Sequence, residues 1–300
     1  MNLLISLFLF FNIAIGATKE ISITMDDPEV TTSPLMTSAE RNQKILNILD
    51  KHKLKTALFV CGMRIDNPEG AALLKLWDEK NHLIANHSYS HLYFPGNKNT
   101  LDVFRADFKK VEPLVSGLKN FTRLFRFPYL KEGDTKEKRD GMREALKASN
   151  YNMGYVSVDA SDWYVDERMK TRLKEDPKAK LDGYRDYYVA HILDRARFYH
   201  DLAAKTYGKE IKHTLLVHHS LLNALFLGDV IEALKKDGWK LISAKDAFAD
   251  PVYQTEPDVV PAGESIVWST AKKQNKYPEM LRYPAEDGTY EKEKMDKLSL

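Results

Sequence analysis

The sequence has a single cysteine, Cys61, so no disulfide bond can form within the chain. Cys61 ends the apolar run Thr56–Cys61, where a buried structural thiol is favoured over a nucleophile. The fold must therefore be stabilised by its hydrophobic core, with help from a metal if one is bound.

An excess of charge of one sign is also missing. The 300 residues carry a formal net charge of +2. Proteins that bind nucleic acids typically display a strong basic surface, so we expect no nucleic-acid partner. The chain is long enough for one large domain with a sizeable core.

Long apolar runs are missing except at the N-terminus. Residues 3–15 are almost wholly apolar, no charged side chain precedes Lys19, and small residues follow at Gly16 and Ala17. This pattern predicts a signal peptide over residues 1–17 and export to the periplasm or the outside. The run is shorter than the roughly 20 apolar residues of a membrane span, and an uncleaved anchor is the alternative. We expect no integral membrane domain after cleavage.

Short apolar runs and amphipathic stretches alternate through the rest of the chain. The predicted strands are Glu20–Met25, Thr56–Cys61, Leu83–Asn86, Arg123–Phe127, Met153–Val158, His213–His218 and Trp239–Ser243. The predicted helices are Ser38–His52, Pro68–Lys80, Thr100–Leu118, Glu137–Asn150, Tyr184–Tyr207 and Leu221–Asp237. This alternation predicts an α/β fold with a parallel sheet, and the pattern alone leaves open whether the sheet is open or closed into a barrel.

Two segments do not follow this pattern. Tyr164–Lys180 is strongly charged without a clear period, which predicts an exposed loop or insertion. The part after residue 250 is interrupted by prolines and ends in charged residues, which predicts an extension that packs on the surface and ends in disorder. We therefore divide the chain into a signal peptide (1–17), one domain (18–250) and a C-terminal extension (251–300).

Polar side chains gather where the predicted strands end. Asp26, Asp27, His87, Asp159 and His218 all lie at or just beyond the C-terminal ends of strands. The active sites of α/β proteins are built at this edge of the sheet. These residues are therefore the candidates for a functional site.

The aspartate pair and a histidine pair could hold a metal. His87 and His91 are four residues apart, so a helical turn between them would put both imidazoles on one face. Adjacent strand residues point in opposite directions, so one of Asp26 and Asp27 could bind metal while the other faces substrate. One oxygen and two nitrogens suit zinc or a similar divalent ion.

Three further segments carry groups for catalysis or binding. Arg126-Phe127-Pro128-Tyr129 ends one strand, and Asp159-Ala160-Ser161-Asp162-Trp163 follows another. In Leu215-Leu216-Val217-His218 the alternation of a strand puts Leu216 beside His218, so an apolar wall is expected next to an imidazole.

These five segments, in this order, resemble the motifs of the polysaccharide deacetylase family, the NodB-homology domain of carbohydrate esterase family 4. The family motifs are T-F-D-D, H-[ST]-x-x-H, R-x-P-Y, D-x-x-D-W and L-x-H, and the resemblance extends from about Ile21 to about Phe248. It implies a distorted (β/α) barrel with parallel strands and outer helices. It also implies metal-dependent hydrolysis of N-acetyl or O-acetyl groups on a glycan, with Zn²⁺ as the favoured ion.

On the metal side, the resemblance implies that Asp27, His87 and His91 are the ligands. Asp26 would be the general base that takes a proton from a metal-activated water. Arg126 would keep Asp26 ionised and oriented.

On the substrate side, the resemblance implies that the backbone N–H of Tyr129 polarises the acetyl carbonyl. Trp163 and Leu216 would form the slot for the acetyl methyl group. His218 would be the general acid, and an aspartate of the fourth motif, Asp162 in preference to Asp159, would tune it.

The chain departs from the family pattern at several positions, among them Met25, Pro28, Leu130 and His219. None of them removes a catalytic group, but Pro28 changes the loop after the aspartates and His219 adds a second imidazole beside His218. We expect an exported deacetylase of peptidoglycan or a chitin-like glycan. An O-acetyl esterase and a non-catalytic carbohydrate-binding protein are the alternatives, and the sequence leaves the oligomeric state open.

Overall fold

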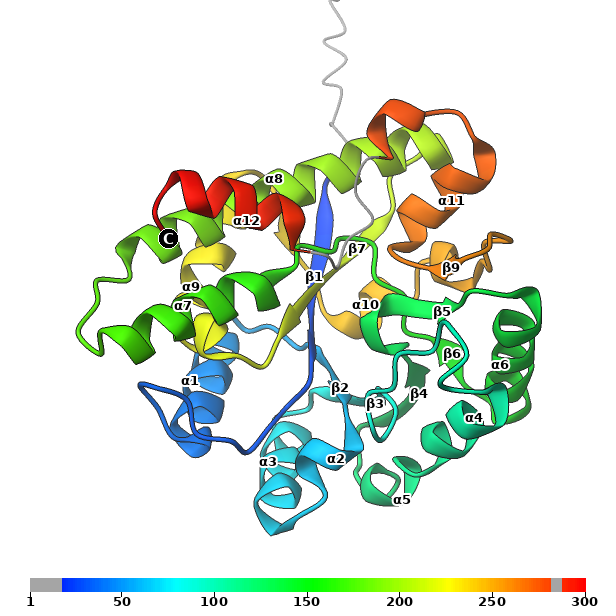
Figure 1. Cartoon of the computed structure of the whole chain (residues 1–300), viewed down its shortest axis with the longest axis horizontal. Coiled ribbons are helices and arrows are strands. Elements are labelled where there is room, and N and C mark those ends of the chain that lie inside the picture. The colour runs from blue at the N-terminus through cyan, green and yellow to red at the C-terminus, as the bar shows by residue number, and fades with distance from the viewer. Residues whose placement is uncertain (1–17, 282–287) are drawn as a thin grey trace, which may run out of the picture.

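The computed structural model describes residues 18–281 and 288–300; the signal peptide predicted for residues 1–17 lies outside them. A parallel sheet forms the centre of the molecule, in the order β6-β4-β3-β2-β1-β7, with β8 paired to the start of β1 (Figure 1). Its strands are β1 (Glu20–Asp26), β2 (Ala57–Val60), β3 (Leu83–Asn86), β4 (Phe121–Phe125), β6 (Asn152–Met153), β7 (Lys212–His218) and β8 (Lys240–Leu241).

The sheet curls into a distorted barrel. The segment that begins as β6 pairs with β4 at Met153, and five residues later Val158 forms a parallel bridge to Leu215 of β7. The Leu216 amide also donates to the Val158 carbonyl oxygen at 3.0 Å. One short segment thus connects the two edges of the sheet, which confirms the fold class that the family resemblance implied.

Helices surround the barrel. Figure 1 shows α1 and α3 on one side, α4 and α6 on a second, and α7 to α9 on a third, with α11 and α12 beside α8. The helices are α1 (Ser38–Lys51), α2 (Gly62–Ile65), α3 (Pro68–Glu79), α4 (Leu101–Lys109), α5 (Glu112–Val115), α6 (Lys136–Ala148), α7 (Asp162–Glu175), α8 (Asp182–Tyr207), α9 (Leu221–Lys236), α10 (Ala244–Phe248), α11 (Ile266–Gln274) and α12 (Thr289–Lys297). No helix of the described residues has the length and apolar character to cross a membrane.

Most predicted elements are confirmed with ends shifted by one or two residues. The strand predicted over Met153–Val158 is shorter: β6 covers Asn152–Met153, and Val158 forms only an isolated bridge. The helix predicted over Thr100–Leu118 is divided into α4 and α5. Pro113 lies in the first turn of α5 and has no N–H to donate, so it ends the hydrogen-bond pattern of the preceding turn. A small antiparallel pair, β5 (Lys131–Gly133) and β9 (Ala262–Gly263), was not predicted.

The prediction of a loop over Tyr164–Lys180 was wrong, because residues 162–175 form α7. Val165, Met169 and Leu173 recur every four residues and are buried, while the charged residues between them, apart from the buried Asp166, are exposed or partly exposed. This narrow apolar stripe is a helical signal that the surrounding charges conceal.

The predicted disorder of the C-terminal end is also wrong for residues 289–297. They form α12, which packs against α7 and buries Met295 and Glu291. Arg168 of α7 lies 2.7 Å from Asp296, and it also donates to the carbonyl oxygen of Leu300. The extension is therefore attached to the helix that begins within the fourth motif.

Candidate active site

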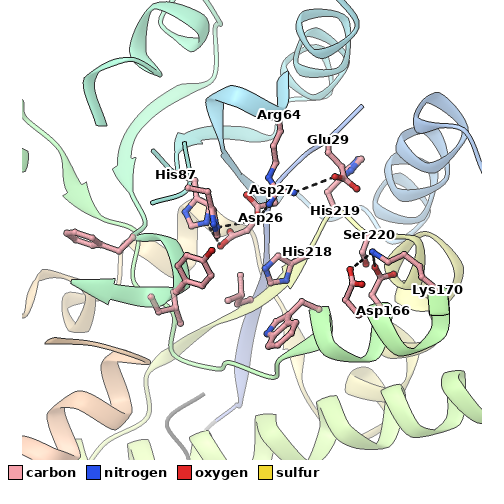
Figure 2. A pocket seen from close by; sticks show the side chains of 17 residues that line it. Asp26, Asp27, Glu29, Arg64, His87, Asp166, Lys170, His218, His219 and Ser220 are labelled. Carbon is pink, nitrogen blue, oxygen red and sulfur yellow. Dashed lines mark hydrogen bonds and ion pairs between the residues drawn. The ribbon is translucent and has the colours of Figure 1, made fainter. Parts of the chain in front are cut away.

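The end of β1 places both aspartates in one cavity. The register sets Asp26 beside Phe59 on one neighbouring strand and beside His218 on the other. Asp27 has φ of 58°, a left-handed conformation that ends the strand. The expectation that adjacent carboxylates point to opposite sides therefore fails here, and Asp26 and Asp27 line the same cavity (Figure 2).

His87 and His91 also reach this cavity, but not through the helical turn that their spacing suggested. Residues 87–92 form no helix; Ser88 and His91 have φ of 65° and 51°, which bends the chain back on itself. The buried carboxylate of Asp107 accepts hydrogen bonds from the backbone N–H of Tyr89 at 3.0 Å and from that of Ser90 at 3.0 and 3.2 Å. The bend is therefore held by a side chain of α4.

Asp27, His87 and His91 form a cluster that suits a divalent metal, with one potential ligand atom of each within 4.8 Å of the others. Oδ1 of Asp27 is buried without a hydrogen-bond partner. Nδ1 of His87 lies 2.9 Å from the carbonyl oxygen of Arg126, which directs the lone pair of Nε2 toward the cavity. An unpaired buried oxygen and a correctly oriented imidazole are what a metal site needs in its free form.

The charge states of the cluster agree with this assignment. Burial lowers the pKa of His87 and of His91 to about 4, so both imidazoles are neutral and can offer lone pairs at neutral pH. Burial opposes the ionisation of Asp27, but His91, His87 and Arg64 hold its pKa below the ordinary value. The cluster therefore presents one carboxylate and two neutral imidazoles.

Asp26 lies beside this cluster and is bound to an arginine. Nη1 of Arg126 donates to Oδ1 of Asp26 at 2.5 Å, and the same guanidinium donates to Oγ1 of Thr24 and to the carbonyl oxygen of Gly154. Burial raises the pKa of Asp26 to about 6 although Arg126 opposes this shift. Asp26 is therefore a carboxylate that is ionised at neutral pH and can still accept a proton.

His218 is paired with Asp162. Nδ1 of His218 lies 2.7 Å from Oδ1 of Asp162, whose Oδ2 accepts from Asn223 at 2.8 Å. Burial lowers the pKa of His218, but the pairing with Asp162 outweighs it and the pKa rises to about 10. Asp159 instead accepts from the backbone N–H of Ser161, so the structure selects Asp162 as the partner.

An apolar wall completes a cavity of about 350 Å³. Leu216 and Leu130 line the cavity and form one hydrophobic cluster with Val156, and Trp163 lines the same cavity. Tyr129 has φ of 56°, and its half-exposed ring contacts the ring of His91 with centroids 4.6 Å apart. The substrate-binding residues predicted from the sequence therefore line the same cavity as the metal cluster.

Residues without an assigned role have surroundings of their own. His219 also lines the cavity, but it is almost fully buried and its Nε2 lies 3.2 Å from Oδ1 of Asn42. Phe94, just after the histidine bend, is buried in the core, while Tyr93 is half exposed and its ring lies next to that of Tyr129. Cys61 is buried, and burial raises its pKa to about 12, which agrees with the expected structural thiol.

Five charged residues of the cavity wall were not predicted: Glu29, Arg64, Asp166, Glu167 and Lys170. Figure 2 labels all of them except Glu167. Lys170 lies 3.0 Å from Asp166, at the i,i+4 spacing of a helix. Arg64 lies 3.4 Å from both Asp27 and Glu29. The i,i+4 charge pair was a readable signal for α7, whereas the contacts of Arg64 join residues that are far apart in the sequence.

Comparisons with known proteins agree with this geometry. Residues 15–152 match the family model described as polysaccharide deacetylase, which confirms the resemblance drawn from the motifs. The fourth and fifth motifs lie beyond the matched residues. No curated protein sequence matches the chain.

Solved structures share the fold at low sequence identity. A peptidoglycan N-acetylglucosamine deacetylase in complex with a hydroxamate-type ligand (4-naphthalen-1-yl-N-oxidanyl-benzamide) is 21% identical with a TM-score of 0.54, over 80% of this chain and 90% of that one. A carbohydrate esterase family 4 pseudoenzyme from Bacillus anthracis is 18% identical with a TM-score of 0.54, over 77% of this chain and 66% of that one. An acetyl xylan esterase from Clostridium thermocellum, solved with a cobalt ion, is 19% identical with a TM-score of 0.50, over 77% and 90%.

Proposed function

We propose that this chain, whose residues 15–152 match the polysaccharide deacetylase family model, is a metal-dependent hydrolase that removes acetyl groups from N-acetylated sugars in a glycan such as peptidoglycan or a chitin-like polymer. One observation carries the proposal. A carboxylate that can accept a proton, Asp26, and an imidazole that stays protonated, His218, lie on the two neighbouring strands β1 and β7 and face one cavity beside the Asp27–His87–His91 cluster.

Asp27, His87 and His91 would hold a divalent cation, with Zn²⁺ favoured by the one oxygen and two nitrogens, and such an ion when bound makes water more acidic and an acetyl carbonyl more electrophilic. Asp26 takes the proton from the attacking water, because Arg126 keeps it ionised and oriented. The backbone N–H of Tyr129 donates to the acetyl oxygen as negative charge develops on it.

His218 then protonates the departing amine. The carboxylate of Asp162 stabilises the imidazolium, so His218 carries the needed proton at neutral pH. Trp163 and Leu216 enclose the methyl group of the acetyl and exclude water from that side. Burial, opposed by Arg126, brings the pKa of Asp26 to about 6, and pairing with Asp162 raises the pKa of His218 to about 10. Near neutral pH Asp26 is therefore ionised and can act as the base, while His218 is protonated and can act as the acid.

We further propose that the protein acts outside the cytoplasm. The N-terminal residues 1–17 would direct export and be removed, residues 18–250 would form the catalytic domain, and residues 251–300 would support it. Peptidoglycan and chitin-like glycans lie on that side of the membrane. The substrate named for one similar structure, peptidoglycan, agrees with this location.

Two alternatives use the same site. O-acetyl ester hydrolysis on a xylan-like glycan has the acetyl xylan esterase as a structural precedent. A non-catalytic glycan-binding protein has the pseudoenzyme as a precedent. This chain keeps a carboxylate at Asp26, an arginine bound to it and a paired imidazole at His218, which favours turnover over binding alone.

The test is acetate release by the purified protein from chitin oligomers, peptidoglycan and acetyl-xylan, with Zn²⁺ or Co²⁺ added. Release from the first two and little from the third supports N-deacetylation, and the reverse order supports the ester hydrolase. Asp26→Asn is expected to lower kcat by at least about 10²-fold while the bound metal is retained. Full activity of that variant would show that Asp26 is not the base. If the wild type binds no metal and releases no acetate, the non-catalytic glycan-binding protein is the alternative that remains.

A further inference from the structure

Arg64 is a charged residue of the cavity wall that none of the five motifs includes. It lies on α2, directly after β2, and its Nη2 atom is 3.4 Å from Oδ2 of Asp27. Its Nη1 atom is 3.4 Å from Oε2 of Glu29. The guanidinium therefore connects a carboxylate of the metal cluster with a second carboxylate two residues further along the chain (Figure 2).

Glu29 is itself held in place by a second arginine. Arg41 of α1 is fully buried and donates to the carbonyl oxygens of Glu29 at 2.8 Å and of Thr31 at 2.9 Å. Nη2 of Arg41 also lies 3.7 Å from Oε1 of Glu29. Alternating charges thus run from the buried side of α1 to the cluster, and they fix the loop that Pro28 begins.

The two oxygens of Asp27 have different surroundings. Oδ2 lies within 3.4 Å of Nη2 of Arg64 and of Nε2 of His91, whereas Oδ1 is buried without a hydrogen-bond partner. A ligand carboxylate whose second oxygen is held by an outer partner keeps a fixed orientation, which raises metal affinity. A bare guanidinium this close to a divalent ion would also repel it, and the carboxylate of Glu29 offsets that charge.

We propose that Arg64 is a positioning residue of the metal site: it holds Oδ2 of Asp27 and so fixes the orientation of this carboxylate in the cluster, and Glu29 compensates its positive charge. The inference rests on the proposed function for the identity of the ligands. It assigns a role to the loop after the aspartates, which departs from the family pattern at Pro28. Arg64 acts through Asp27 and does not take part in proton transfer.

The test measures metal affinity in the full chain without substrate, by competition between the protein and a chromogenic chelator for Zn²⁺ and for Co²⁺. Arg64→Met is expected to weaken Kd for both ions by about 10- to 100-fold. Arg64→Lys keeps the charge but not the two-pronged geometry, so it is expected to recover only part of the affinity. Arg123→Met is the matched control, because Arg123 also pairs with a glutamate but lies outside the cavity.

Glu29→Gln tests the compensation separately. It leaves Arg64 in place with an unbalanced charge, so Kd is expected to weaken at low ionic strength and to approach the wild-type value as salt is added. A Kd that is unchanged or tighter in Arg64→Met would overturn the proposal. A higher KM at an unchanged Kd would also overturn it and make Arg64 a substrate-binding group.

Failure of this inference and failure of the proposed function can be told apart. A wild-type chain that binds metal but frees no acetate refutes hydrolysis, while the Kd values of the variants still decide the role of Arg64. Normal acetate release by the wild type with an unchanged Kd in Arg64→Met refutes only the positioning role. A wild-type chain that binds neither ion refutes both.

Discussion

Asp162 binds His218 through both of its oxygens: Oδ1 lies 2.7 Å from Nδ1 of the imidazole, and Oδ2 accepts from the backbone N–H of the same residue at 2.9 Å. The carboxylate thus fixes both the charge and the position of His218. Because the ring binds through Nδ1, its Nε2 atom is left to face the cavity. The two residues are 56 positions apart, so only the folded chain joins them.

Asp162→Asn is expected to shift the alkaline limb of the pH profile of kcat/KM. In the wild type the pKa of His218 is raised to about 10, so the acid stays protonated up to that pH. Removing the negative charge lowers this pKa toward the ordinary histidine value of about 6.5, and the alkaline limb moves to lower pH. At pH 8 we expect a loss of about 10²-fold in kcat/KM.

The measurement is a pH series of acetate release with metal at saturation. Asp159→Asn is the control, because Asp159 is a buried aspartate of the same segment that accepts from Ser161 and makes no hydrogen bond to His218. If both variants shift the alkaline limb equally, the specific pairing of Asp162 with His218 is not the cause.

Arg126→Lys is expected to shift the acidic limb of the pH profile of kcat/KM to higher pH. The pKa of Asp26 is raised to about 6 by burial against the opposing effect of Arg126, so the base is ionised above that pH. A lysine ammonium cannot reproduce the three donor contacts of the guanidinium, so the pKa of Asp26 rises and activity appears only at higher pH. A cation bound in the cluster would move the acidic limb to lower pH in both the wild type and Arg126→Lys.

The same pH series at constant metal concentration tests this prediction, with an expected loss of about 10- to 100-fold in kcat/KM near neutral pH. Arg139→Lys is the matched control, since Arg139 is also buried in ion pairs but lies outside the cavity. If the acidic limb of Arg126→Lys stays at the wild-type pH, Arg126 does not control the ionisation of Asp26.

Asp107→Ala is expected to weaken metal binding without touching a ligand. Its carboxylate accepts from the backbone of Tyr89 and Ser90, inside the bend that brings His87 and His91 together. Without it two backbone N–H groups lose their partner and the bend loosens, so we expect Kd for Zn²⁺ to rise by about 10- to 100-fold. Chelator competition measures this; Asp102→Ala, on the exposed side of the same helix, is expected to keep the wild-type value.

Met295→Ala tests whether the C-terminal extension is part of the folded domain. Met295 is fully buried where α12 packs on α7, so its truncation leaves a cavity and is expected to cost about 2–5 kcal/mol in the free energy of unfolding. Urea denaturation followed by circular dichroism gives this value. Lys297→Ala, at an exposed position of the same helix, is expected to change it by less than about 0.5 kcal/mol. Equal stability of both variants would mean that α12 contributes little to the fold.

The order of strands and helices could be predicted because it depends on local patterns. Leu215–Val217 is apolar throughout, and Ile21–Met25 is apolar except for the small residues Ser22 and Thr24; such runs are typical of parallel strands buried on both faces. The pattern failed at α7, where Val165, Met169 and Leu173 form a stripe too narrow to stand out among charges. It failed again at α12, whose few apolar residues are buried only once the helix packs on the rest of the fold, α7 included.

The sequence alone determined which groups are present: two aspartates at one strand end, two histidines at another, an arginine, and a histidine with a leucine two residues before it. It determined their placement at the C-terminal edge of the sheet as well, because strand ends can be read from apolar runs. The tertiary structure decided how these groups pair. It turned Asp27 into the cavity of Asp26, chose Asp162 over Asp159 for His218, and brought Arg64 of α2 to Asp27. Such contacts depend on loop conformations and on side chains from distant segments, which no local pattern specifies.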